Sequence, residues 1–233
     1  MSQQIGRNWI AAVAAVLYLV APLVARQDHQ EAPRDQWQRA AEVFEAMGVG
    51  PGSVVADLGA GGGWFTTRLA RAVGTSGRVY AVDVNPISLR ELRDALPKEL
   101  TNIEIVRGEE NDPKLPAGQL DAVLVVNAYH EFAEYAAVLD KVRAALKPGG
   151  RLVLIEPTPL RLEDITRAAQ AKRHQIAIEF AEADLTQAGF EIVRKDLSFV
   201  KRPAHQMAGG VSHAPIDWLL VARRPADSQL FEP

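Results

Sequence analysis

Two carboxylates in the first half of the sequence stand where short apolar runs end. Asp57 ends the run SVVADL just before a glycine-rich turn, and Asp83 closes the run RVYAVD. A glycine turn between a strand and a helix lets a ligand approach the helix N-terminus. A carboxylate beside that turn can hold a cationic amine and would repel a pyrophosphate. A carboxylate at the next strand can accept hydrogen bonds from both ribose hydroxyls. The spacing therefore indicates a zwitterionic nucleoside ligand.

The glycine spacing also bears on the alternative ligand, a nicotinamide dinucleotide. Gly59, Gly61 and Gly63 form the pattern G-x-G-x-G, and the third position of a dinucleotide fingerprint is occupied by Trp64. Dinucleotide sites need G-x-G-x-x-G, so that the backbone can approach the pyrophosphate and the helix can pack closely. A nicotinamide-dependent oxidoreductase is therefore the less favoured alternative.

A second group of polar residues follows the apolar run LDAVLVVNA, in the order Asn127, Ala128, Tyr129, His130 and Glu131. His130 is the candidate general base, which is needed only if the group that reacts keeps a proton. Tyr129 could donate a hydrogen bond to a substrate or stack on a planar one. His174 is an alternative base, because it lies near the start of a predicted helix beside the variable part of the chain.

The remaining chemistry-bearing residues give weaker signals. The chain has no cysteine, which excludes disulfides, iron–sulfur clusters, thiolate zinc sites and cysteine nucleophiles. His205 and His213 lie eight residues apart, but two histidines without a third ligand make an incomplete metal site. No metal is therefore predicted. No G-x-S-x-G elbow is present, which argues against a serine hydrolase.

The elements that must position these residues alternate between strands and helices. Strands are predicted over 53–58, 78–84, 102–108, 120–128 and 151–157. Helices are predicted over 34–47, 85–96, 132–146 and 172–188, and a further helical stretch carries Phe65, Leu69 and Val73 on one face. Two late strands, 190–199 and 214–223, follow one another without a helix and predict an antiparallel hairpin at a sheet edge. The fold class is α/β, a Rossmann-like three-layer sandwich with a mostly parallel sheet.

The composition and the N-terminal residues indicate the binding partners and the location of this domain. The 233 residues carry 26 Lys and Arg against 29 Asp and Glu, and this balance argues against a nucleic-acid partner. Residues 9–25 hold no charge and follow Arg7, which is the layout of a secretory signal peptide or an N-terminal membrane anchor. We predict residues 1–25 as that segment and 34–225 as one domain, located in the cell envelope. The domain is either exported or anchored in the inner membrane facing the cytoplasm.

Four segments taken together resemble the successive signatures of class I S-adenosylmethionine-dependent methyltransferases, in particular the small bacterial methyltransferase-domain group. These segments are VVADLGAGGGWFTTRLA, VYAVDV, LDAVLVVNAYHEF and LKPGGRLVLIE. The resemblance spans roughly residues 37–223 and implies a seven-stranded sheet whose last strand is reversed.

The resemblance also implies roles for individual residues. Asp57 would face the methionyl amino group of S-adenosylmethionine, and Asp83 would hold the ribose. The turn residues Gly59, Ala60, Gly61 and Gly63 would pass beneath the methionine and ribose. Glu109 or Glu110 would contact the adenine, and Asn127 would approach the sulfonium.

The expected function is methyl transfer from S-adenosylmethionine to a small-molecule acceptor, for which a lipophilic compound is one option. The donor and acceptor atoms need only be brought to about 3 to 3.5 Å along one axis, so little covalent machinery is required. A non-catalytic nucleoside-binding module is the second alternative. The sequence gives no oligomeric state, and its N-terminal segment suggests membrane association.

Overall fold

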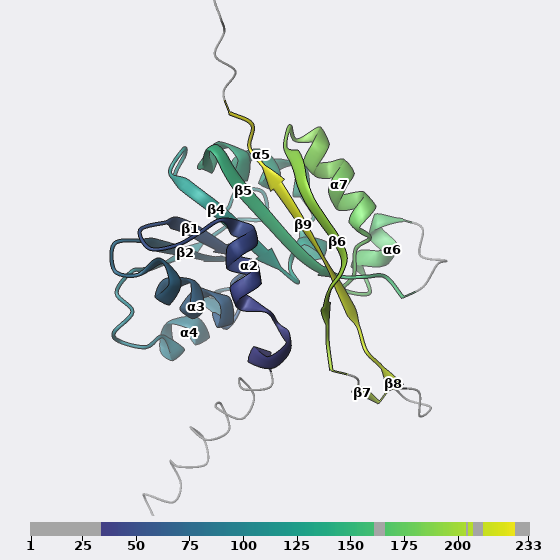
Figure 1. Ribbon diagram of the computed structural model, residues 1–233, viewed down its shortest axis with the longest axis horizontal. Helices are drawn as coiled ribbons and strands as arrows, with labels where there is room; N and C mark the ends of the chain where they lie inside the picture. Colours follow the sequence, from purple (N-terminus) through teal and green to yellow (C-terminus); the bar gives the residue numbers. More distant parts are fainter. Residues whose placement is uncertain (1–33, 161–165, 204, 207–211, 227–233) are drawn as a thin grey trace, which may run out of the picture. The chain divides into compact units, whose positions relative to one another are not determined.

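The computed structural model describes residues 34–160, 166–203, 205–206 and 212–226 (Figure 1). The chain separates into two compact units, one ending at Arg39 and one beginning at Ala40. The predicted helix over 34–47 is interrupted, because Arg39 adopts a positive φ of 54° and helix α2 spans Ala40–Met47. The apolar segment 9–25 lies outside the described residues. No helix among the described residues is long and apolar enough to cross a membrane.

The second unit is built on a seven-stranded sheet with the order β3-β2-β1-β4-β5-β9-β6. Its strands are β1 Val54–Leu58, β2 Arg78–Asp83, β3 Ile103–Arg107, β4 Leu120–Val126, β5 Leu146–Pro157, β6 Glu191–Lys201 and β9 Ile216–Arg223. Strands β1 to β5 pair in parallel, and β9 is antiparallel to both β5 and β6. The predicted mostly parallel sheet with an antiparallel hairpin at one edge is confirmed.

Helices cover both faces of this sheet. Helices α3 Trp64–Val73 and α4 Pro86–Ala95 connect β1 to β2 and β2 to β3. Helix α5 Tyr135–Ala145 connects β4 to β5, and α7 Ile178–Gln187 precedes β6. Right-handed crossovers that run in opposite directions from the β1–β4 pair place α3 and α4 on one face and α5 on the other (Figure 1). The predicted three-layer architecture follows.

Two further predicted helices differ in the structure. Residues 129–131 form a short 3₁₀ helix, η1, and Phe132 is extended, so α5 starts only at Tyr135. Within the predicted helix 172–188 only α7 is helical, because Ala177 is extended and its N–H donates to the Gln170 side chain at 2.7 Å; a separate short helix, α6 Arg167–Ala171, precedes the predicted range. Each break follows from a polar contact or an extended residue that the apolar spacing does not reveal.

A short two-stranded ribbon extends the β6–β9 hairpin. Strand β7 His205–Gln206 pairs with β8 Ser212–His213, and the backbones of the two histidines are opposite one another. The strand order reverses between β1 and β4, and in open α/β sheets ligands bind beyond the carboxyl ends of the strands at such a reversal. The fold therefore predicts a ligand site at the loops that follow β1, β2 and β4.

Candidate functional site

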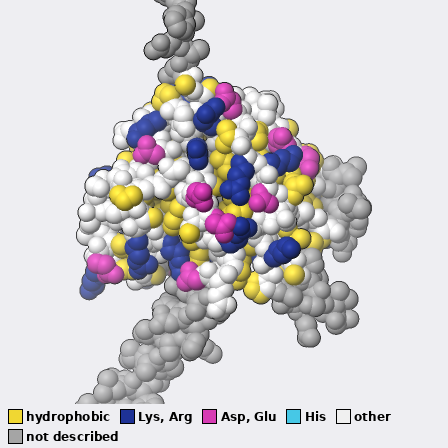
Figure 2. Space-filling model, in the orientation of Figure 1, with side chains coloured by type: hydrophobic (Ala, Val, Ile, Leu, Met, Phe, Trp, Pro, Cys, Tyr) yellow, Lys and Arg dark blue, Asp and Glu magenta, His cyan; other side chains and the backbone are white. Residues whose placement is uncertain are grey.

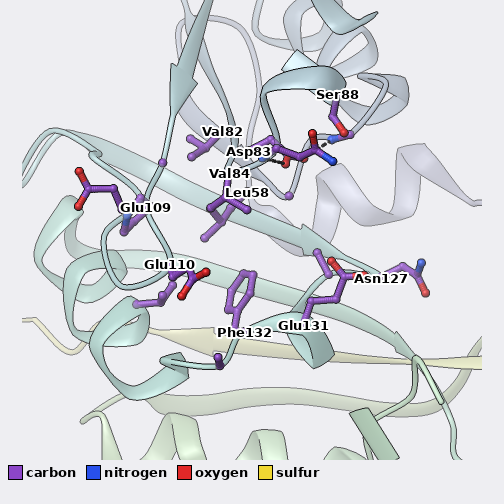
Figure 3. Close-up of a pocket in the computed structure, with 18 residues that line it drawn as sticks. Leu58, Val82, Asp83, Val84, Ser88, Glu109, Glu110, Asn127, Glu131 and Phe132 are labelled. Carbon is purple, nitrogen blue, oxygen red and sulfur yellow. Dashed lines mark hydrogen bonds between the residues drawn. The ribbon is translucent and has the colours of Figure 1, made fainter. Parts of the chain in front are cut away.

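A cavity of about 590 Å³ opens at the carboxyl ends of β1, β2 and β4 (Figure 3). This volume lies within the range of small-molecule sites, about 300 to 1,000 Å³. Its walls come from the glycine turn, the ends of β2 and β3, the start of α4 and the segment after β4. Its lining includes Leu58, Gly59, Gly61, Asp83, Glu109, Glu110, Asn127, Glu131, Phe132 and Val138.

The glycine turn is fixed against the neighbouring strands. The N–H groups of Gly59 and Ala60 both donate to the Val82 carbonyl, at 2.8 and 3.0 Å. Gly59 has a φ of 81°, and a Cβ there would lie 2.4 Å from the Cβ of Ala128. Only glycine fits between the ends of β1 and β4, so the backbone of this turn can form the cavity wall.

Two other turn residues have packing roles. Ala60 is buried against Leu89 and Leu92 of α4 and is absent from the cavity wall. Gly63 precedes α3 with a φ of 79°, and a Cβ there would lie 2.1 Å from the Leu92 side chain. The structure therefore brings Gly59 and Gly61 to the cavity, whereas Ala60 and Gly63 hold the turn against α4.

Asp83 lies in the wall of the cavity with a fixed carboxylate. One oxygen accepts from the Gly61 N–H and the other from the Asn85 N–H, both at 2.9 Å (Figure 3). A carboxylate has about four lone-pair sites, so each oxygen can accept one further hydrogen bond. Asp83 is thus oriented in advance and retains capacity for two ligand hydroxyl groups.

Asp57 does not line this cavity. Its side chain is buried, with 3% of the residue exposed, and one oxygen accepts a 2.6 Å hydrogen bond from the Thr66 hydroxyl in the first turn of α3. Neighbouring strand residues point to opposite faces, and Leu58 is the one that reaches the cavity. The structure thus places the Asp57 carboxylate against the start of α3, while Asp83 lies in the cavity wall. The role of Asp57 at the methionyl amino group stays a prediction.

The two acidic residues after β3 differ in their surroundings. Glu109 forms an ion pair with Lys114 at 3.2 Å and bridges to Asp112 through backbone hydrogen bonds. The carboxylate of Glu110 has no hydrogen-bond or ion-pair partner among the described residues. Figure 3 shows the Glu110 side chain directed toward Phe132, whereas Glu109 points away. Both residues touch the cavity, and Glu110 is the one available to a ligand.

The cavity is acidic. Its lining contains the carboxylates of Asp83, Glu109, Glu110 and Glu131, and none of its described lining residues is Lys, Arg or His. Carboxylates that share a partly desolvated site attract a cation and repel an anion. The site therefore favours a positively charged ligand and disfavours a pyrophosphate.

Asn127 marks the side of the cavity that follows β4. It lies in the cavity wall and adopts a positive φ of 54°. Its side-chain oxygen accepts from Arg202 at 3.3 Å, and Arg202 forms a 2.8 Å ion pair with the buried Asp217 of β9. Burial raises the pKa of the Asp217 carboxyl, and Arg202 opposes that rise. This network links the reversed strand to the cavity.

Tyr129 is placed away from the cavity. Its ring is completely buried, and its hydroxyl donates to Asp184 of α7 at 2.8 Å. Arg167 lies over the ring at 4.9 Å and also binds Asp184 at 2.7 Å. Burial raises the pKa of the phenol well above its ordinary value. The Tyr129 hydroxyl thus joins η1 to α7 in this structure, and the contact of Tyr129 with a substrate stays a prediction.

His130 is held by a residue that the sequence reasoning missed. Its Nδ1 lies 2.7 Å from Oε2 of Glu156, and the other oxygen of Glu156 accepts from the Tyr129 N–H at 2.6 Å. Glu156 is fully buried near the end of β5. An acidic residue in the otherwise apolar run RLVLIEP was the available signal, because buried acids are almost always paired.

The second ring nitrogen of His130 faces the turn that follows α6. Its Nε2 lies 3.3 Å from Nδ1 of His174, so the two candidate bases are neighbours in space. His130 itself is absent from the cavity lining, and Glu131, the next residue, is part of it. The arrangement joins a buried, oriented imidazole to the edge of the cavity.

Comparison with known proteins gives one family and related sequences. The family model described as a methyltransferase domain matches residues 55–150. A ubiquinone/menaquinone biosynthesis C-methyltransferase UbiE from Hydrogenovibrio crunogenus is 32% identical over 122 residues, 52% of this chain and 47% of that protein. The UbiE protein from Erwinia tasmaniensis is 25% identical over 194 residues, 75% of this chain and 76% of that protein. The first alignment thus spans about half of the relative's length.

Solved structures share the fold. A SAM-dependent methyltransferase from Aquifex aeolicus has a TM-score of 0.62 at 22% identity, covering 79% of this chain and 89% of that chain. The [4+2]-cyclase SpnF has a TM-score of 0.66 at 18% identity, covering 82% of both chains. The matched domain, the related sequences and the reversed last strand agree: residues 55–150 match a methyltransferase domain, and the chain has the fold of the class I S-adenosylmethionine-dependent methyltransferases.

Proposed function

We propose that this protein binds S-adenosylmethionine in the acidic cavity and transfers its methyl group to a small, lipophilic acceptor. The observation that carries the proposal is the lining of the cavity: four carboxylates, with no cationic side chain among its described residues. This charge suits a sulfonium nucleoside that also carries an ammonium group. It does not suit the pyrophosphate of a nicotinamide cofactor.

The residues present fit the parts of this cofactor. Asp83 offers two spare acceptor positions to the ribose hydroxyls, and the bare backbone of Gly59 and Gly61 allows the chain to approach the nucleoside. Glu110 is placed to accept from the adenine amino group. Asn127 and Glu131 lie on the other side of the cavity in Figure 3 and are assigned to the acceptor side.

When bound, S-adenosylmethionine supplies an electrophilic methyl group. The protein must then orient donor and acceptor on one axis and exclude water. Apolar lining from Leu58, Phe132 and Val138 supports a lipophilic acceptor. The names of the UbiE relatives, which describe C-methylation in ubiquinone and menaquinone biosynthesis, support the same class. On the viewed face, basic and acidic side chains are interspersed, which favours a small molecule over a nucleic acid (Figure 2).

Calorimetry on the full chain tests the cofactor. We expect heat from S-adenosylmethionine and S-adenosylhomocysteine and none from NADH. Removing the Asp83 carboxylate by Asp83→Ala should weaken binding about 10- to 150-fold, because hydrogen bonds to a charged group contribute about 1.5 to 3 kcal/mol. Binding of NADH in preference to S-adenosylhomocysteine would reverse the assignment in favour of an oxidoreductase.

A second candidate function is a nucleoside-binding module that does not transfer methyl groups. It is kept because SpnF, whose fold is similar, is described as a [4+2]-cyclase. Incubation with methyl-labelled S-adenosylmethionine and quinone-precursor phenols separates the two. Label in the acceptor supports transfer, whereas tight cofactor binding without label in any acceptor supports the module.

A further inference from the structure

Three side chains converge beside the cavity, at the junction of η1 and α6. They are His130, Glu131 and His174, and the sequence separates the two histidines by 44 residues. Nε2 of His130 lies 3.3 Å from Nδ1 of His174 and 3.7 Å from Oε1 of Glu131. The third side, from His174 Nδ1 to the same Glu131 oxygen, is 3.8 Å. Two nitrogens and one carboxylate oxygen therefore form a nearly regular triangle.

The size of this triangle fits a metal ion. The centre of a triangle with these sides lies about 2.1 Å from each corner, within the zinc–nitrogen and zinc–oxygen bond range of about 2.0 to 2.2 Å. Two imidazoles and one carboxylate are the ligand set of several catalytic zinc sites, which leave a further position to water or substrate. The borderline-soft nitrogen donors favour zinc over magnesium or calcium.

His130, the buried residue of the triangle, has the hydrogen-bond partner that is typical of a metal-binding histidine. Glu156 is fully buried and already accepts from the Tyr129 N–H, so it acts as a carboxylate acceptor toward His130. The proton of His130 then sits on Nδ1, which leaves Nε2, the atom at the corner of the triangle, with its lone pair for a metal ion. Histidines that bind metals almost always donate their other N–H to a carboxylate or carbonyl in this way.

The other two ligands leave the site open. The side chain of His130 is 1% exposed, whereas those of Glu131 and His174 are 63% and 75% exposed. Glu131 also lines the cavity. An ion at the centre of the triangle would therefore be anchored on the buried side by His130. It would be reachable from the solvent side and would adjoin the acceptor side of the cavity.

We propose that His130, Glu131 and His174 bind a zinc ion, with Glu156 as the positioning residue. The sequence predicted no metal, because the ligands come from two distant segments with no recognisable spacing. The open position would take water or the oxygen of an acceptor with an acidic hydroxyl. That last assignment rests on the proposed function, whereas binding of the ion does not.

Direct metal binding by the full chain tests the proposal. The protein is freed of metal with a chelator and titrated with zinc chloride, with Co²⁺ as a spectroscopic probe. We expect one equivalent of zinc and the visible absorption of a low-symmetry Co²⁺ site. The exposed-ligand variants Glu131→Gln and His174→Ala should each weaken zinc binding at least 10-fold. Glu156→Gln should weaken it about 10- to 100-fold, as changes to a supporting residue do.

The matched control is Glu134→Gln, an exposed carboxylate three residues from Glu131 that lies outside the triangle. It should bind zinc as the unaltered chain does. Because Glu131 and His174 are exposed, their variants should fold, which circular dichroism checks. Unchanged zinc affinity in the Glu131→Gln, His174→Ala double variant would place the ion elsewhere and overturn the proposal. So would the absence of binding to the unaltered chain.

The same metal-free protein is titrated with S-adenosylmethionine, which separates the two proposals. If the protein binds S-adenosylmethionine but not zinc, the proposed metal site is wrong and the proposed function stands. If it binds zinc but not S-adenosylmethionine, the proposed function is wrong and the metal site stands. The Co²⁺ spectrum gives a further readout, because a small phenol that enters the open position should shift its bands.

Discussion

At the scale of single residues, the two acids after β3 show how a neighbouring cation changes a residue's availability. Glu109 is paired with Lys114, whereas Glu110 faces the cavity with no partner among the described residues. A carboxylate that is already paired gains less from a new hydrogen bond than one that is free.

We therefore expect Glu110→Gln to weaken binding of S-adenosylmethionine about 10-fold or more, since a hydrogen bond to a charged group contributes about 1.5 to 3 kcal/mol. The matched variant Glu109→Gln should change it less than about 5-fold, because exposed ion pairs contribute about 0 to 1 kcal/mol. Calorimetric titration of both variants provides the measurement. Equal losses in the two variants would contradict the distinction.

Tyr129 gives a second prediction, for stability. Its buried hydroxyl donates to Asp184, so Tyr129→Phe should lower the free energy of unfolding by about 0.5 to 1.5 kcal/mol. The affinity for S-adenosylmethionine should stay within about 3-fold, because Tyr129 does not line the cavity. Urea denaturation and calorimetry measure the two quantities. A large loss of cofactor affinity with unchanged stability would instead indicate that Tyr129 contacts the bound ligand.

Tyr129 also predicts that the free energy of unfolding decreases at alkaline pH. The pKa of the phenol is raised in the folded chain, so above pH 10 the unfolded chain loses a proton that the folded chain retains. The stability contributed by the buried neutral phenol is complete below pH 10 and is lost as pH rises toward the folded pKa. Urea denaturation between pH 9 and 11 should show a shallower decline for Tyr129→Phe than for the unaltered chain.

At the scale of elements, the turn between β1 and α3 depends on packing as much as on ligand approach. Gly63 has a positive φ and leaves no room for a Cβ beside Leu92, whereas Gly62 has no atom near its Cβ position. The two adjacent glycines therefore form a matched pair for testing the turn.

We expect Gly63→Ala to lower the free energy of unfolding by at least about 1 to 3 kcal/mol, because it adds backbone strain and a clash with α4. Gly62→Ala should change it by no more than about 1 kcal/mol. Thermal unfolding of both variants, with and without S-adenosylmethionine, gives the comparison. Similar behaviour of the two variants would show that the turn moves to accommodate a side chain.

At the scale of the whole molecule, the location of the domain is the open question. The apolar N-terminal segment suggests export, whereas the proposed cofactor, S-adenosylmethionine, is made in the cytoplasm. We propose that residues 9–25 anchor the chain in the inner membrane, with the domain facing the cytoplasm. Added protease should then leave the domain intact in spheroplasts and degrade it after lysis. Degradation in intact spheroplasts would support export instead. Mass spectrometry of the mature N-terminus would show whether residues 1–25 are removed.

The overall topology was accessible from the sequence because it rests on local patterns. Alternating apolar runs and helical spacing gave the parallel strands, and two consecutive late strands gave the reversed hairpin. Helix boundaries were less accessible. The break before α7 depends on the Gln170 side chain, and the 3₁₀ turn at Tyr129 on the buried Glu156.

The sequence by itself determined the β1 glycine turn, the acid that ends β2 and the order of the elements, because these follow from neighbouring residues. Only the tertiary structure decided that Asp57 turns toward α3 while Asp83 reaches the cavity, because that depends on which face of a strand meets which neighbour. It also decided that Glu156 orients His130 beside His174. Such contacts join residues 26 and 44 positions apart, and no local periodicity specifies them.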